Sequence, residues 1–130
     1  MSDYEDRFER GMELLKKMGR ENTMRDQKAL SEDLYRLSVG HLFGDIWTRP
    51  HLSLRERQLI TLAANIAMCR PHGNHSHYRS AKHIGVKHEE IMEVIMQVGA
   101  YTGWPTMALA VAQYTQVLNE TEAEAKAAIS

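Results

Sequence analysis

Residues 54–68 read LRERQLITLAANIAM, and this stretch decides the fold. Its apolar side chains recur three and four positions apart, which is the spacing of one face of an α-helix. Charged residues crowd the first turn, and Ser53 stands directly before it as a candidate N-cap. The apolar positions are Leu59, Leu62, Ala63, Ile66 and Ala67. The stretch therefore predicts a helix of the core.

The segments N-terminal to this helix show the same period. Residues 4–18 predict an amphipathic helix that ends near Gly19. Residues 30–46 carry two neighbouring apolar stripes, which predicts a helix buried between neighbours. Pro50 requires that helix to end by about Arg49. The first stripe is Leu30, Leu34, Leu37 and His41, and the second is Tyr35, Val39, Leu42 and Ile46.

Three further helices are expected C-terminal to it, over residues 75–85, 88–102 and 107–118. Residues 120–130 form either a surface helix or a frayed tail. No segment alternates apolar and polar residues, and there is no hairpin signal. We therefore predict an all-α fold: one domain over residues 1–130, about six to seven helices, with residues 1–3 and about 120–130 at its periphery.

Composition limits the classes of function. The formal charge of −1 over 130 residues lacks the basic excess of nucleic-acid-binding proteins, so no nucleic-acid partner is expected. No apolar run is long enough to span a membrane, and the lone Cys69 cannot form an internal disulfide. These features predict a cytoplasmic protein without a membrane partner. Cys69 is interpreted as a small buried apolar residue.

The stretch 69–85, CRPHGNHSHYRSAKHIG, holds four of the seven histidines. A metal site is disfavoured, because residues two apart on a helix project roughly 200° apart, which separates His75 from His77. His77 lies on the inward stripe, either as a hydrogen-bonded core residue or as an acid/base, and the residues alone favour the first. His75 faces water or a subunit interface. Trp47 and Trp104 either line a cavity or, as we favour, fill the core.

Three blocks of the sequence, taken in the order in which they occur, resemble the pattern of one known family. They are RFERGMELLKKM at residues 7–18, GDIWTRPHLSLRERQLITLAA at 44–64, and HYRSAKHIGVKHEEIMEVIMQVGAYTGWP at 77–105. The pattern resembles the carboxymuconolactone decarboxylase family within the alkylhydroperoxidase-D-like superfamily, over about residues 4–119. The resemblance implies an orthogonal helical bundle that forms homo-oligomers, commonly trimers or hexamers, with active-site clefts at subunit contacts.

Founding members of that family decarboxylate γ-carboxymuconolactone without a metal or organic cofactor. The resemblance thus implies a small-molecule substrate, such as a lactone or unsaturated acid, and no cofactor. His77 matches the histidine that both branches of the superfamily keep, and His72 matches the histidine of the decarboxylase motif. In the thiol-peroxidase branch, cysteines would fall on Arg70 and Gly73 and a glutamate on Gln58, so peroxidase activity of that type is excluded.

The chain departs from the family where typical members read Gly-Arg-Glu-His-Glu, because it reads CRPHG at residues 69–73. His75 also stands where the family often has arginine. With His77 as the leading acid/base and His72 as its partner or oxyanion donor, Arg49 or Arg70 is a candidate clamp for a second carboxylate. The apolar wall is assigned to Trp47 and Trp104. Alternatives are an isomerase or cyclase on the same scaffold, or a non-catalytic oligomeric binding protein.

Overall fold

The computed structural model describes residues 3–70 and 72–129. Over these residues the chain forms seven α-helices and one π-helical stretch, with no strand, which confirms the all-α prediction. The chain divides into two compact units, Met1–Arg57 and Gln58–Ser130. None of the described helices is both long and apolar enough to cross a membrane. That the whole chain is a single domain stays a prediction.

The first unit contains α1 (Asp3–Lys17), α2 (Arg25–Leu30), α3 (Glu32–Leu37) and the π-helical stretch η1 (Ser38–Ile46). The single helix predicted from residue 30 is thus divided. Ser31 adopts an extended conformation that ends α2, and its Oγ accepts a hydrogen bond from the backbone N–H of Leu34 at 3.1 Å. A serine that caps the following helix in this way starts α3 in a new direction.

The winding of η1 changes which side chains it buries. Its hydrogen bonds span five residues, as from the N–H of Trp47 to the carbonyl of Leu42 at 3.0 Å. Phe43 and Trp47 are buried, whereas Leu42 and Ile46 stay about 40% exposed. The second stripe is thus buried as predicted only at Tyr35 and Val39. The first stripe is exposed at Leu30, Leu34 and Leu37, so the prediction of a helix buried along both stripes was wrong.

Small residues let α1 and η1 approach each other closely. A methyl group added at Gly11 would overlap the carbonyl oxygen of Val39, and one added at Gly44 would overlap that of Arg7. At the same crossing, Arg10 donates from Nη2 to the Asp45 carboxylate at 3.1 Å and from Nε to the carbonyl of Gly44 at 3.3 Å. Backbone contact and a charged pair therefore hold the two helices together.

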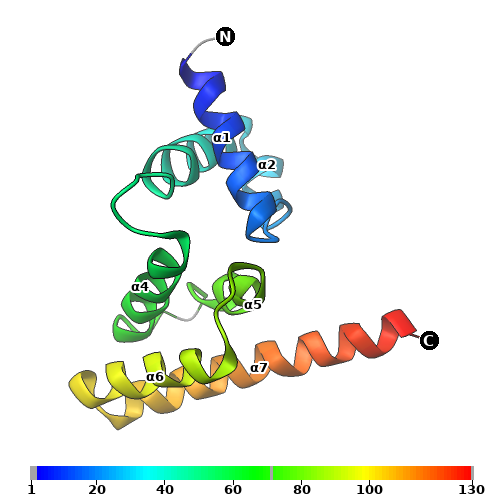
Figure 1. The fold of residues 1–130 in the computed structure, drawn as a ribbon. Coiled ribbons are helices and arrows are strands. Elements are labelled where there is room, and N and C mark those ends of the chain that lie inside the picture. The colour runs from blue at the N-terminus through cyan, green and yellow to red at the C-terminus, as the bar shows by residue number, and fades with distance from the viewer. Residues whose placement is uncertain (1–2, 71, 130) are drawn as a thin grey trace. The chain divides into compact units, whose positions relative to one another are not determined.

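The second unit contains most of α4 (Leu54–Ala67), together with α5 (His75–Ile84), α6 (His88–Thr102) and α7 (Trp104–Ile129). Figure 1 shows α6 and α7 lying side by side, joined by the turn at Gly103. The predicted cap of α4 is confirmed: Ser53 Oγ accepts from the N–H of Glu56, whose carboxylate accepts from the N–H of Ser53. The core is formed by Leu62, Ile66, Tyr78, Ala81, Val86, Ile91, Ile95, Ala110, Tyr114 and Val117.

The chain after Leu118 continues as a helix and is tied to α5. His75 Nε2 lies 2.8 Å from a carboxylate oxygen of Glu120, which also accepts from Arg79 at 3.4 Å. Arg79 pairs with Glu124 as well. Hydrogen bonding by His75 lowers the pKa of Glu120. Of the two alternatives for residues 120–130, the described part up to Ile129 is a surface helix.

Cys69 corrects an expectation: it is exposed, not buried. It follows the end of α4 and adopts a left-handed conformation, with φ at 53°. The N–H of Cys69 donates to the carbonyl of Ile66 and that of Arg70 to Asn65, which is the hydrogen-bond pattern of a Schellman motif. The side chain therefore leaves the apolar face of α4, because the backbone reverses at this residue.

Candidate active site around His77

His77 lies in the first turns of α5 and is buried, as its position on the inward stripe predicted. Gln58, which is fully buried on α4, holds it from two sides. The amide nitrogen of Gln58 donates to the backbone carbonyl of His77 at 2.6 Å and to Ser80 Oγ at 3.1 Å. Its amide oxygen lies 3.3 Å from the imidazole Nδ1 of His77. One side chain thus positions both the ring and its backbone.

This arrangement fixes the tautomer of the imidazole. The carbonyl of His77 can only accept a hydrogen bond, so the Gln58 atom facing it must be the amide nitrogen. The amide oxygen then faces Nδ1, and an oxygen acceptor requires Nδ1 to carry the proton. In the neutral ring the lone pair is therefore on Nε2. The buried amide selects which nitrogen can act as a base.

A second pair of amides anchors the beginning of α5. Asn65 on α4 donates to Asn74 Oδ1 at 3.0 Å, and Asn74 Nδ2 donates to the carbonyl of Leu62 at 3.0 Å. Asn74 was predicted to cap α5. It does precede the helix, but its side chain makes no capping bond and is committed to α4 instead. Neutral side chains from α4 therefore hold both the start of α5 and His77.

The other predicted site residues of the second unit have a different environment. Arg70, His72 and His75 are exposed, and Trp104 is 63% exposed at the first position of α7. His75 lies on the opposite face of α5 from His77, as predicted, and bonds to Glu120. Pro71, part of the altered CRPHG sequence, lies outside the described residues. The favoured core role for Trp104 was therefore wrong within this unit.

Trp47 and Arg49 belong to the first unit. Trp47 is buried and packs on Phe43, with ring centroids 5.8 Å apart, which confirms the core role that the sequence favoured. Arg49 is exposed in the turn that follows η1, and its carbonyl accepts a hydrogen bond from Arg57. Trp47 thus contributes to packing in this unit, whereas the guanidinium of Arg49 is open to solvent.

Sequence reasoning missed Gln58, Asn65, Asn74 and Ser80 as the groups that position the site. A signal for two of them was present. Gln58 and Asn65 stand four before and three after Leu62, so both fall on the helix face that carries the core residues Leu62 and Ile66. A polar residue on a buried face needs a hydrogen-bond partner. Which partner it finds depends on tertiary packing.

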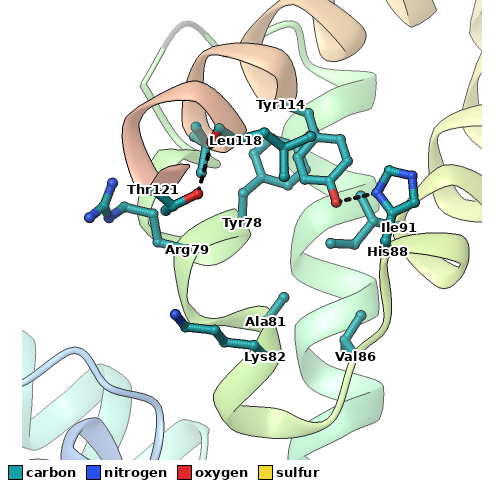
Figure 2. Close-up of a pocket in the computed structure, with 11 residues that line it drawn as sticks. Tyr78, Arg79, Ala81, Lys82, Val86, His88, Ile91, Tyr114, Leu118 and Thr121 are labelled. Atoms are coloured by element: carbon teal, nitrogen blue, oxygen red, sulfur yellow. Dashed lines mark hydrogen bonds between the residues drawn. The ribbon is translucent and has the colours of Figure 1, made fainter. Parts of the chain in front are cut away.

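A pocket of about 210 Å³ lies beside this site, between α5, α6 and α7, and His77 is not among its lining residues (Figure 2). Its walls include Tyr78 and Tyr114, whose rings are 4.9 Å apart. Burial raises the pKa of Tyr78 to about 12. Among the described residues, no three histidine, cysteine, aspartate or glutamate side chains gather as a metal-binding group.

Comparison with known proteins identifies the family. The sequence model of the carboxymuconolactone decarboxylase family matches residues 32–116. The chain belongs to this family. The matched region includes α4 and α5, so the buried pair of Gln58 and His77 lies inside the part of the chain that the family model matches.

Among individual proteins, the chain is similar to 4-carboxymuconolactone decarboxylase from Acinetobacter baylyi. It is 26% identical over 120 residues, which cover 89% of this chain and 90% of the relative. The two proteins are therefore similar over nearly their whole lengths. Membership of the carboxymuconolactone decarboxylase family, expected from the three sequence blocks, is confirmed.

Proposed function

We propose that this protein is a cofactor-independent decarboxylase of a small lactone or unsaturated acid, with His77 as its general acid/base. The observation that carries the proposal is the buried contact between Nδ1 of His77 and the amide oxygen of Gln58. Membership of the family and the similarity to a 4-carboxymuconolactone decarboxylase support the reaction class. Histidine suits such a role because its proton exchanges near neutral pH.

Decarboxylation begins when the bond between the ring carbon and the carboxylate breaks and carbon dioxide leaves. The electron pair of the broken bond moves into the conjugated carbonyl of the substrate, which becomes an enolate. A donor must stabilise that enolate, and a proton must then reach carbon. With Nδ1 held by Gln58, Nε2 delivers this proton from the doubly protonated ring of His77, which is left neutral with the lone pair on Nε2 and takes its next proton from solvent. An apolar surrounding favours loss of the carboxylate charge.

The remaining assignments rest on the family pattern and on chemistry. His72 is proposed as the partner of His77 or as the donor to the enolate oxygen. Arg70 or Arg49 is proposed to clamp a second carboxylate, since a guanidinium binds carboxylates through two parallel hydrogen bonds. Trp104, whose ring is exposed, is proposed as the apolar wall and His75 as a further substrate contact, whereas the buried Trp47 keeps the packing role described above. No metal or organic cofactor is assigned.

The test uses unsaturated lactone acids, γ-carboxymuconolactone first, labelled with ¹³C at the carboxyl group. Released carbon dioxide is followed by ¹³C NMR as bicarbonate. We expect His77→Gln to lower kcat by about a hundredfold or more, in the range found for general acid/base groups. His83→Gln is the matched control, because His83 is exposed on the same helix. It should retain full activity.

The outcomes separate the alternatives. Full turnover by a folded His77→Gln variant would overturn the role of His77. Product formed without release of labelled carbon dioxide would indicate an isomerase or cyclase and contradict decarboxylation. Saturable binding of the lactone acids without any product would indicate a non-catalytic binding protein, the alternative that the loss of both motif glutamates at residues 71 and 73 suggests.

A further inference from the structure

The pocket between α5, α6 and α7 combines an apolar interior with two cationic side chains at one side. Figure 2 shows Arg79 and Lys82 projecting from α5 on one side, with His88 opposite. Tyr78 and Tyr114 form the wall between them. The remaining lining residues are Ala81, Val86, Ile91, Val117, Leu118 and Thr121. Most of this surface is hydrocarbon or aromatic ring.

The two cations differ in what they already bind. Arg79 pairs with Glu120 and Glu124 on α7, so its charge is compensated. Lys82 makes no ion pair within the part of the chain that the structure describes, and it is exposed at the pocket. An unpaired ammonium group beside an apolar cavity is complementary to an anion that carries an apolar body.

The wall across the pocket from Lys82 is formed by aromatic rings that hold one another in place, and it has one polar contact. His88 Nδ1 and the hydroxyl of Tyr114 are 2.7 Å apart, and the two rings stack with centroids 5.5 Å apart. Tyr114 also contacts Tyr78, so three rings hold one another in place. Rings fixed by their neighbours lose little conformational entropy when a flat ligand packs on them. This wall therefore suits a planar ligand.

We propose that this pocket binds a small monocarboxylate with an aromatic or similarly apolar body, its carboxylate facing Lys82. The volume of about 210 Å³ fits this class, because a protein cavity of about 150 Å³ holds benzene. The extra space accommodates one carboxylate. The site is separate from the proposed reaction at His77, which does not line it, so it is a second ligand site on the same helix.

The experiment uses benzoate as the probe and benzamide as its neutral counterpart. Binding to the full chain is followed by two-dimensional ¹H–¹⁵N NMR, with calorimetry for the dissociation constant. We expect benzoate to bind more tightly than benzamide and to shift the amides of residues 78–82 and 114–121. Lys82→Gln should weaken benzoate about threefold, in the range of exposed ion pairs, and leave benzamide unchanged.

Three further variants complete the design. Thr121→Asp places a carboxylate at the pocket and should weaken benzoate more than Lys82→Gln does, because it adds repulsion. Lys17→Gln removes an exposed lysine of the first unit and should change neither ligand. His77→Gln should bind benzoate normally, so failure of the decarboxylase proposal and failure of this one are distinguishable.

Three results would overturn the proposal. The first is the absence of saturable benzoate binding. The second is equal affinity for benzoate and benzamide, which would remove the role of charge. The third is an unchanged benzoate affinity in both Lys82→Gln and Thr121→Asp while the spectra of the folded variants remain intact.

Discussion

Cys69 occupies a backbone conformation that suits glycine better than a residue with a side chain. Its φ of 53° lies in the left-handed region, at the position after a helix where glycine is most common. We expect Cys69→Gly to raise the free energy of unfolding by about 0.5 to 1 kcal/mol, since the left-handed penalty exceeds the added entropy of the unfolded chain. Urea unfolding measures this difference.

Cys69→Ser is the matched control for that substitution. Serine removes the thiol, which lies 3.6 Å from Thr106 Oγ1, but keeps the Cβ atom that causes the strain. Its unfolding midpoint should stay close to that of the parent. A Cys69→Gly protein that unfolds at lower urea than both would contradict the explanation from backbone conformation.

The phenol of Tyr78 predicts how stability depends on alkaline pH. Its ordinary pKa of 10.0 rises to about 12 in the folded protein because the group is buried. Its contribution is complete below pH 10.0 and is lost as the pH rises toward about 12, because the unfolded chain ionises first. We expect urea midpoints to fall over this interval. In Tyr78→Phe the fall should be smaller, and an identical fall would contradict the assignment.

The face that each histidine occupies could be predicted at this scale, but its hydrogen bonds could not. The 100° rotation per residue of a helix was enough to separate His75 from His77. The partner of His77 is Gln58, 19 residues away on another helix. Nothing local in the sequence indicates that an amide of α4 meets an imidazole of α5, because that distance is set by how the two helices pack.

Among the elements, η1 shows where helical periodicity fails. The stripes assigned at 3.6 residues per turn placed Leu42 and Ile46 inside, whereas the wider π-helical turn buries Phe43 and Trp47. Both patterns are apolar, so the sequence satisfies either winding. The close approach of α1 selects between them, since Gly40 and Gly44 both face α1 in the π-helical form.

The crossing of α1 and η1 gives a prediction for the element scale. Gly11→Ala should lower the free energy of unfolding by about 1 to 3 kcal/mol, the usual cost of overpacking, because the new methyl group meets the backbone of Val39. Gly40→Ala is the control within the same contact. Its nearest neighbour would be the Arg7 Cβ at 3.6 Å, an ordinary separation. Thermal unfolding by circular dichroism compares the two.

Equal losses of stability in both glycine variants would contradict the role of close backbone approach. In that case only the general cost of changing glycine within a helical segment would remain. A stabilised Gly40→Ala protein beside a destabilised Gly11→Ala protein would support the packing argument most directly, because alanine favours helix formation where it fits.

At the scale of the whole molecule, we expect a homo-oligomer, a trimer or hexamer. Leu30 is 87% exposed, and Leu34 and Leu37 are also exposed on the same segment of the first unit. Large apolar residues exposed close together in the sequence favour an interaction surface on this segment. Light scattering at micromolar concentration should give a multiple of 14.9 kDa. A well-folded monomer would contradict the expectation.

The Leu30→Lys, Leu37→Lys double variant identifies the surface involved. We expect it to lower the mass seen by light scattering while its helical circular dichroism is kept. Tyr101→Lys, Ile129→Lys is the control, because it also replaces two exposed apolar residues by lysine, on α6 and α7. If the double variant of Leu30 and Leu37 keeps the parent mass, this surface is not the interface.

The all-α class and most helix ends of the second unit could be predicted from period and punctuation alone. Ser53 marks the start of α4, and Gly85 and Gly103 mark the ends of α5 and α6. Such helix ends depend on residues that are adjacent in the sequence, so the sequence alone can indicate them. The division of the chain after Arg57 could not be predicted, because no proline- or glycine-rich linker accompanies it. It falls inside α4, and only tertiary contacts reveal it.

The amide at position 58 is electrically neutral, so it orients the ring of His77 without attracting a second proton to it. A carboxylate at the same place, as in Gln58→Glu, would stabilise the doubly protonated ring by direct charge attraction. The imidazole would then hold its second proton more tightly and would transfer it less readily. The amide nitrogen of Gln58, which glutamate would replace by an oxygen, therefore helps to decide whether His77 is neutral or doubly protonated before substrate binds.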